Sequence, residues 1–198
     1  MSTVMSLLLG MTSLTPMVVP RESKGPTEPK DSPEQYTGVA IETGGKVPGK
    51  SMLFDFHIDR YTSDEELKRF VGVLKDKGTA ILRSELEKEN VGRIRTVGGV
   101  GNRIAIARKR QNGSGTMITI VTAGIMPFTD LYHNRRNTGY PFGLLKVKLD
   151  ATSQGGGHIM TAAKIRFHKT AGSYEIGSYG NQYIKAANVR FANRVPNT

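Results

Sequence analysis

The stretch that most constrains the fold is residues 53–60, LFDFHIDR, in which apolar and polar side chains alternate. Phe54, Phe56 and Ile58 occupy every second position, with acids or a histidine between them. A period of two is typical of a β-strand with one buried face, because successive side chains of a strand point to opposite sides. The stretch therefore predicts a half-buried strand and a domain that contains a sheet.

A phosphate-loop motif directly precedes this strand. Gly44, Gly49, Lys50 and Ser51 match the pattern G-x-x-x-x-G-K-[ST], which binds nucleotide phosphates through backbone N–H groups, a lysine and a hydroxyl. That chemistry requires a helix after the lysine, because the free N–H groups of a helix N-terminus must face the anion. A strand is predicted there instead. We interpret the motif as a glycine-rich hairpin loop, with Lys50 and Ser51 as a false match, and expect no cofactor.

The rest of the chain predicts an α+β domain with a mostly antiparallel sheet, a meander that is either open or barrel-like. A two-helix segment is expected at about residues 63–88, because Ser63 and Glu66 form a capping box before an apolar helical repeat. Gly78 ends the first helix, and a second runs from Ile81 to about Lys88. Further strands are expected at residues 38–42, 93–97, 103–110, 116–122, 144–149, 158–168, 173–178 and 183–191.

The N-terminal third of the chain divides into an apolar segment, a linker and the start of the domain. Residues 1–20 resemble the apolar part of a signal peptide, with a docked N-terminal arm as the alternative. Residues 21–35 are rich in proline and charge and predict a disordered linker, and residues 36–194 predict a single domain. No apolar run is long enough for a transmembrane helix. We expect a secreted or periplasmic protein, with a cytoplasmic one as the alternative.

Charge is distributed very unevenly along the chain. Residues 91–198 carry 16 Lys and Arg against 3 Asp and Glu, whereas residues 1–90 carry 12 against 14. A strongly basic half attracts polyanions, although the same residues also occur as the solvated outer face of a sheet. The chain has no cysteine, which excludes disulfides, thiolate metal sites and cysteine nucleophiles.

One candidate for chemistry lies on the polar face of the opening strand. Asp55, His57 and Asp59 share that face, and carboxylates beside an imidazole suit a divalent metal or a general base. Alternation also produces such rows on any solvated strand face, so the sequence predicts no metal site. A metal-dependent or acid–base enzyme that uses these residues is the alternative function.

A second group of candidates is cationic. Arg108, Lys109 and Arg110 are predicted near a hairpin tip, and Arg135 and Arg136 lie in a long loop with tyrosines nearby. Cations mixed with aromatic rings bind phosphates and stack on bases. No nucleic-acid module signature accompanies them, so we expect an anionic surface, ligand or protein partner in preference to nucleic acid.

Several short strings resemble those of a family of small exported bacterial proteins of unknown function. They are YTSD at 61–64, GRI at 92–94, GGVG at 98–101, YPFG at 140–143 and ANVR at 187–190, and the resemblance spans roughly residues 38–191. The resemblance implies export and a single α+β domain, and it transfers no catalytic residue. Taken together, the sequence favours a non-enzymatic binding or structural domain that acts through a basic sheet face.

Overall fold

The structure, a computed structural model, describes residues 33–43, 49–113, 115–128, 131, 139–168, 170, 173–178 and 184–192. These residues all belong to one compact unit, Asp31–Thr198. The predicted signal segment, most of the predicted linker, Gly44 of the phosphate-loop motif, Arg135 and Arg136 lie outside the described residues.

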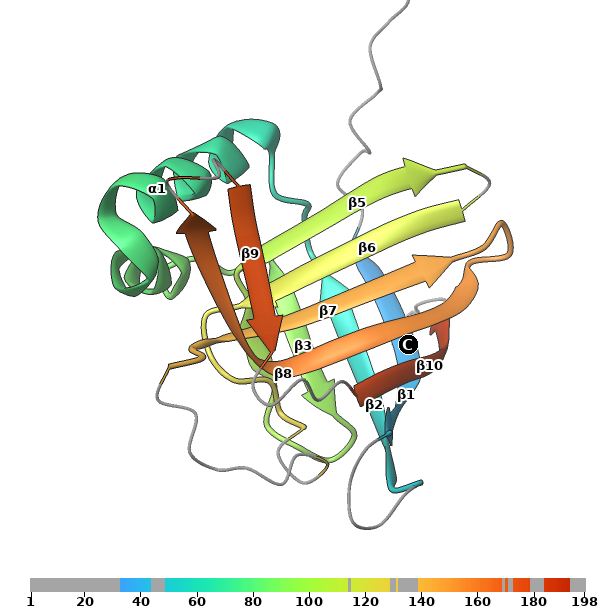
Figure 1. Ribbon diagram of the computed structural model, residues 1–198. Coiled ribbons are helices and arrows are strands. Elements are labelled where there is room, and N and C mark those ends of the chain that lie inside the picture. The colour runs from blue at the N-terminus through green and yellow to red at the C-terminus, as the bar shows by residue number, and fades with distance from the viewer. Residues whose placement is uncertain are drawn as a thin grey trace, which may run out of the picture. The chain divides into compact units, whose positions relative to one another are not determined.

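The described chain forms one helix and a mostly antiparallel sheet (Figure 1). The elements are β1 Glu34–Glu42, β2 Ser51–Ile58, α1 Asp64–Leu86, β3 Gly92–Thr96, β4 Asn102–Ile104, β5 Ile106–Asn112, β6 Gly115–Thr122, β7 Phe142–Leu149, β8 Gln154–His168, β9 Ser173–Ser178 and β10 Ile184–Phe191. The predicted sheet-rich fold is confirmed. β2 begins at Ser51, so a strand and not a helix follows Lys50.

The sheet curls into a nearly closed barrel. Its strand order is β4-β3-β2-β1-β10-β8-β7-β6-β5, with β9 paired to β8 outside this path. The two ends of the order, β4 and β5, are consecutive in the chain and only Ala105 separates them. The Ala105 backbone N–H already donates to the Val121 carbonyl of β6, 2.9 Å away. A single strand was expected at 103–110. The structure has two strands there, β4 and β5, which form the two opposite edges of the sheet.

The barrel interior is filled by side chains from every wall. Phe54, Phe56 and Ile58 of β2 are each no more than 1% exposed, and they pack with Ile118, Leu145 and other inward residues. Tyr36 stacks on Phe56 with ring centroids 4.9 Å apart. Burial of these large apolar side chains supplies most of the driving force for closing the sheet.

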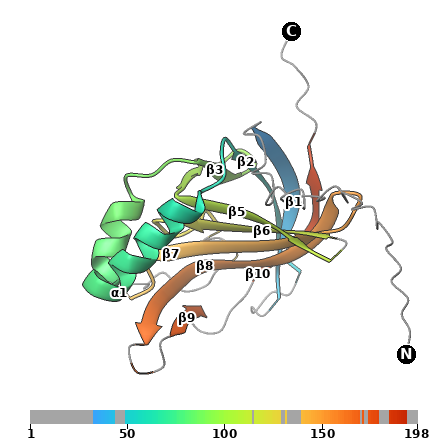
Figure 2. The ribbon, with the colours of Figure 1, turned by 90° about the horizontal axis from the view of Figure 1, so that it is seen from above.

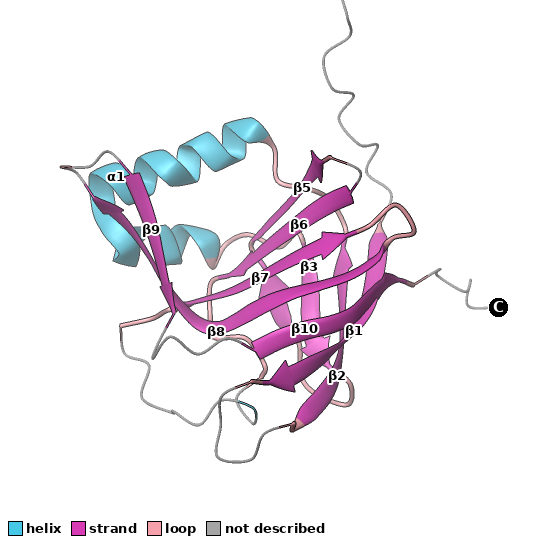
Figure 3. Cartoon of the chain, turned by 45° about the vertical axis from the view of Figure 1, so that its right-hand side comes forward, coloured by secondary structure: helices cyan, strands magenta, loops and turns pink. Residues whose placement is uncertain are grey.

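The helix covers part of the barrel's outer surface (Figure 3). Phe70, Leu74, Leu82 and Leu86 of α1 form a second apolar cluster with outward residues of β5, β6, β7 and β8. The predicted capping box is present: Ser63 Oγ accepts from the Glu66 N–H at 3.2 Å, and the Ser63 N–H donates to Glu66 Oε2 at 2.8 Å.

The prediction of two separate helices is not supported, because residues 64–86 belong to one helix, α1, although two helical segments meet within it at a kink at Gly78. Gly78 lies inside it with φ 83° and ψ −177°, a conformation open to glycine and strained for other residues. Thr79 continues the helix directly, and its Oγ1 donates to the Ile165 carbonyl of β8 at 3.0 Å. The glycine therefore bends α1 without introducing a loop, and Figure 2 shows helical turns on both sides of the bend.

Candidate functional site

The strand face of Asp55, His57 and Asp59 lines an open hollow of about 300 Å³ on the outside of the barrel. Two arginines of β3, Arg93 and Arg95, line it too, because their register places them opposite His57 and Asp55. Sequence reasoning missed both arginines. Arg93 and Arg95 are two residues apart, so the sequence shows that they share one face of their strand. Only the sheet order shows that this strand, β3, lies next to β2.

The ion pairs in this hollow limit what its acids do. Arg95 Nε lies 3.0 Å from both carboxylate oxygens of Asp55, whose side chain is 12% exposed. His57 Nε2 is 4.0 Å from Asp59 Oδ2, and both of those side chains are well exposed. Among the described residues, no group of three or more His, Cys, Asp and Glu is arranged to hold a metal ion. The Arg95 guanidinium already pairs with the Asp55 carboxylate, which a bound metal ion would need as a ligand.

The basic triplet Arg108, Lys109 and Arg110 is divided by the alternation of β5. Arg108 points outward, donates to the Thr62 carbonyl and forms an ion pair with Asp64. Lys109 is oriented to the opposite side and reaches Glu34 at one end of the barrel. Arg110 is exposed on the outer surface. The three cations therefore do not form one patch, and they lie within β5 and not at the hairpin tip.

Lys109 belongs to a polar cluster at one end of the barrel core. Its Nζ donates to Glu34 Oε1 at 2.7 Å, while the hydroxyls of Tyr36 and Tyr61 both donate to Glu34 Oε2. Burial raises the pKa of Glu34, but the hydrogen bonds from Lys109, Tyr61 and Tyr36 outweigh it and hold the pKa below its ordinary value of 4.5. Burial and the Glu34 carboxylate raise the pKa of both tyrosines, so they stay protonated donors. This geometry suits a structural role, because it links the start of β1 to β5.

We expect Glu34→Gln to lower the free energy of unfolding at pH 7 by about 1.5 to 3 kcal/mol, the usual size for hydrogen bonds to a charged group. Because the folded-state pKa of Glu34 is depressed, its contribution is present above pH 4.5 and is lost as the pH falls through that lower pKa. Denaturant unfolding from pH 3 to pH 8 checks this. The exposed carboxylate variant Glu65→Gln serves as control and should change stability much less. A Glu34→Gln loss that persists undiminished at pH 3 would contradict the account.

A group of exposed basic side chains lies on the outer side of β5, β7, β8 and β10, part of the near wall of the barrel in Figure 1. We define the basic wall as Arg110, Lys146, Lys148, His158 and Lys185, all of which are exposed. No Asp or Glu occurs in β5, β6, β7, β8 or β10. Within the described part of the chain, Arg110, Lys146, Lys148 and Lys185 have no acidic partner.

The register brings three basic residues of the wall side by side. Lys146 of β7 lies opposite His158 of β8, which lies opposite Lys185 of β10. Residues directly opposite in an antiparallel pair have Cβ atoms about 4.5 to 5.5 Å apart, so Lys146 and Lys185 flank His158 on one face of the sheet. Sequence reasoning missed the lysines of this wall, although Lys146 and Lys148 alternate with buried residues and so predict a shared outer face.

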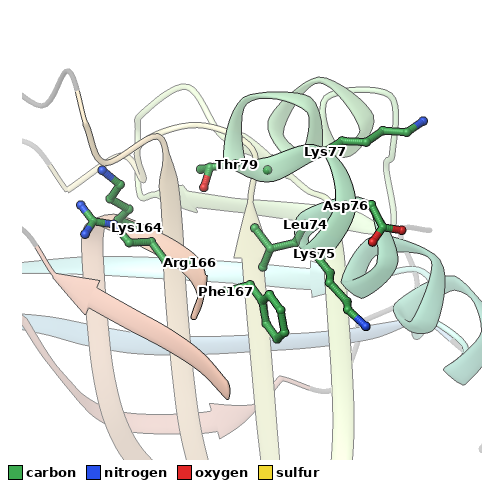
Figure 4. A pocket seen from close by; sticks show the side chains of 9 residues that line it. Leu74, Lys75, Asp76, Lys77, Thr79, Lys164, Arg166 and Phe167 are labelled. Atoms are coloured by element: carbon green, nitrogen blue, oxygen red, sulfur yellow. The ribbon is translucent and has the colours of Figure 1, made fainter. Parts of the chain in front are cut away.

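A second hollow, of about 480 Å³ and lined by more cations than acids, lies at the bend of α1 (Figure 4). Lys75, Lys77, Lys164 and Arg166 line it together with Phe167. Lys75 Nζ lies over the Phe167 ring, 6.0 Å from its centroid. Figure 4 shows that Lys77 points away from the hollow and that Lys164 and Arg166 lie on the side opposite Lys75. The cations surround the hollow without converging on one point inside it.

No helix among the described residues combines the length and the apolar character that a membrane span requires. Comparison of the chain with protein-family models, with curated proteins and with solved structures finds no match to any of them.

Proposed function

We propose that this protein is a non-enzymatic binding domain that recognises an anionic partner through the basic wall. The observation that carries the proposal is the row of Lys146, His158 and Lys185 on adjacent strands, in a wall whose strands contain no acid. Lys146 and Lys185 of this row, together with Lys148 and Arg110, place several positive charges on one outer face of the barrel. A surface with several like charges attracts a partner of the opposite charge, and this supports the assignment.

The alternative function, a metal-dependent or acid–base enzyme on the His57 face, has weaker support. The Asp55 carboxylate is held by Arg95, and Asp59 lies at the limit of ion-pair distance from His57. A general base gains catalytic power from close, fixed partners, which this exposed face does not supply. The geometry therefore favours binding at the basic wall over catalysis at His57.

The proposed function predicts that the full-length protein binds an immobilised anionic polymer such as heparin at low salt and is released as salt rises. Contacts between fixed charges weaken with ionic strength, because bound counterions are released on association. Retention should be strong at 50 mM salt and lost well below 1 M. Absence of retention at 50 mM, or retention that salt does not change, would contradict the proposal.

Export of the chain is a separate proposal. It is supported by the apolar character of residues 1–20 and by the resemblance to exported bacterial proteins. Sequencing the N-terminus of the mature protein tests it: a new N-terminus between residues 15 and 35 is expected, and an intact Met1 on protein found in the cytoplasm would contradict it.

A further inference from the structure

The strand β9 forms an edge of the sheet that lies outside the barrel. β8 continues past the barrel wall beyond Ala163, where its pairing with β7 ends, and from there it pairs with β9 (Figure 1). Within the described ranges, β8 is the only strand that pairs with β9, and no other backbone hydrogen bond reaches β9. The other edge of β9 therefore presents N–H and C=O groups that are a template for a further strand.

A contact of β8 shows which backbone groups of β9 point outward. The Ile165 carbonyl accepts from Thr79 Oγ1 of α1 at 3.0 Å, so it points away from β9. Opposite residues in an antiparallel pair alternate between hydrogen-bonded and non-hydrogen-bonded, so Ile165 and its opposite residue Ile176 form a non-hydrogen-bonded pair. The N–H and C=O groups of Ile176, and those of Tyr174 and Ser178 two residues away, therefore point to the open edge.

The open edge also carries apolar side chains. Tyr174 and Ile176 are 46% and 48% exposed. They lie opposite Phe167 and Ile165 of β8, which pack against the apolar cluster of α1. Opposite residues share a face of the sheet, so Tyr174 and Ile176 continue the apolar face of β8 past the part that α1 covers. A strand added to β9 would cover part of both side chains.

The other two edges of the sheet are protected against strand addition, and β9 is not. β4 has only 3 residues, and β5 carries three successive cations, Arg108, Lys109 and Arg110. The Thr62 N–H also donates to the Ala107 carbonyl of β5 at 2.8 Å. Short length, charge and a covering segment are usual means by which proteins block edge strands. β9, with the sequence SYEIGS, has one charge and no proline.

We propose that β9 pairs with β9 of a second copy of this chain, in a two-fold symmetric dimer centred on Ile176. In an antiparallel pair with this centre, Ile176 lies opposite Ile176 of the second copy, and Tyr174 lies opposite Ser178 of that copy. The outward backbone groups of both strands then meet partners, and the same surface serves both copies, as a two-fold axis requires. Ile165 and Ile176 of one copy continue into Ile176 and Ile165 of the other as one apolar row across four strands.

The charges near this edge fit the same register. Glu175 is the one charged side chain of β9, and its Oε2 lies 2.7 Å from His168 Nε2 of β8. In the dimer Glu175 lies opposite Gly177 of the second copy, and Lys164 of that copy follows on the next strand. Lys164 has no acidic partner within the described residues. A strand of arbitrary sequence satisfies the backbone groups alone, whereas the second copy also supplies the matching isoleucine and a cation on the side of the carboxylate.

The size of the edge sets the expected strength of the dimer. β9 has 6 residues, fewer than the roughly 20 to 30 residues a side of a standard interface, so we expect a monomer–dimer equilibrium. Sedimentation velocity of the full chain between about 5 and 500 µM measures it. Ile176→Lys places two like charges opposite each other at the two-fold axis and should weaken dimerisation about tenfold or more.

Ile81→Lys on α1 is the matched control, because it makes the same change at a similar exposed fraction, 44% for Ile81 against 48% for Ile176. It should dimerise like wild type. Ile176→Cys gives a second readout, because the chain has no cysteine. Residues of a hydrogen-bonded antiparallel pair have Cα atoms about 5.5 Å apart, within the range of a disulfide. Mild oxidation should therefore link two copies of Ile176→Cys, and Ile81→Cys far less.

A protein that stays monomeric up to the highest concentration would overturn the inference. A dimer that Ile176→Lys leaves unchanged would overturn it too, because that dimer must use another surface. If Ile176→Lys does not fold, the cysteine variants decide: linkage of Ile176→Cys no faster than that of Ile81→Cys would contradict pairing through β9. None of these results bears on the basic wall, which is tested separately by salt-dependent retention on heparin.

Discussion

Gly157→Ala is expected to lower the free energy of unfolding by about 3 to 5 kcal/mol, which is at the upper end for a single substitution. Gly157 of β8 lies opposite Val147 of β7, one of the inward residues of the barrel. A Cβ at this position would lie 1.8 Å from the Lys146 carbonyl oxygen. That oxygen is backbone, so no side-chain rotation relieves the overlap. The two strands must separate, and the core beneath them must repack.

Denaturant unfolding of wild type, Gly157→Ala and Gly177→Ala tests this expectation. Gly177, on the neighbouring strand β9, has no atom within 4 Å of the added Cβ, so the same methyl group there meets no obstacle. The control should be neutral or slightly stabilising, because alanine restricts the unfolded chain more than glycine does. Equal stability of the two variants would show that β7 and β8 are not as closely apposed as described.

Replacing Lys146, Lys148 and Lys185 together with glutamine is expected to weaken binding to an anionic ligand about 100-fold at low salt. Each exposed cation near an anionic surface contributes about 1 kcal/mol, and the three lie on the same outer face of β7 and β10. Heparin and anionic vesicles are both suitable probes. The side chains are exposed, so folding should be unaffected, and an unchanged unfolding midpoint verifies this.

The matched control replaces Lys68, Lys75 and Lys77 of α1 with glutamine, which gives the same net charge. It should bind nearly as well as wild type, because these lysines lie outside the basic wall. The reverse result, strong loss in the α1 variant and little in the wall variant, would place the anion at the hollow beside Gly78 and contradict the basic wall as the binding surface.

Local sequence patterns predicted the elements of the fold well. Alternation of Phe54, Phe56 and Ile58 identified β2, and Ser63 with Glu66 identified the start of α1. The expected strand at 158–168 omitted Gly155, Gly156 and Gly157, because glycine is depleted in strands generally. Here the strand uses glycine because its neighbours approach too closely for a side chain. The interruption of the helix at Gly78 was located correctly, but the helical segments on its two sides belong to one element, α1, and not to two separate helices.

The candidate site was harder to predict, because it depends on which strands are neighbours. No local pattern shows that β1 pairs with β10, or that Lys146, His158 and Lys185 form one row. One feature could have been found from the sequence. The alternation of β5 places Lys109 on the side opposite Arg108 and Arg110, so the adjacent triplet was never a single surface patch.

The salt dependence of affinity for anionic ligand, compared between wild type and the two triple variants, tests the central claim most directly. Each cation that neutralises the partner contributes nearly one unit to the slope of log affinity against log salt. The account predicts that Lys146→Gln/Lys148→Gln/Lys185→Gln reduces the magnitude of that slope by about two to three, while the α1 variant of equal charge keeps the wild-type slope. Identical slopes for the two variants would show that binding follows net charge alone and would contradict a specific role for the basic wall.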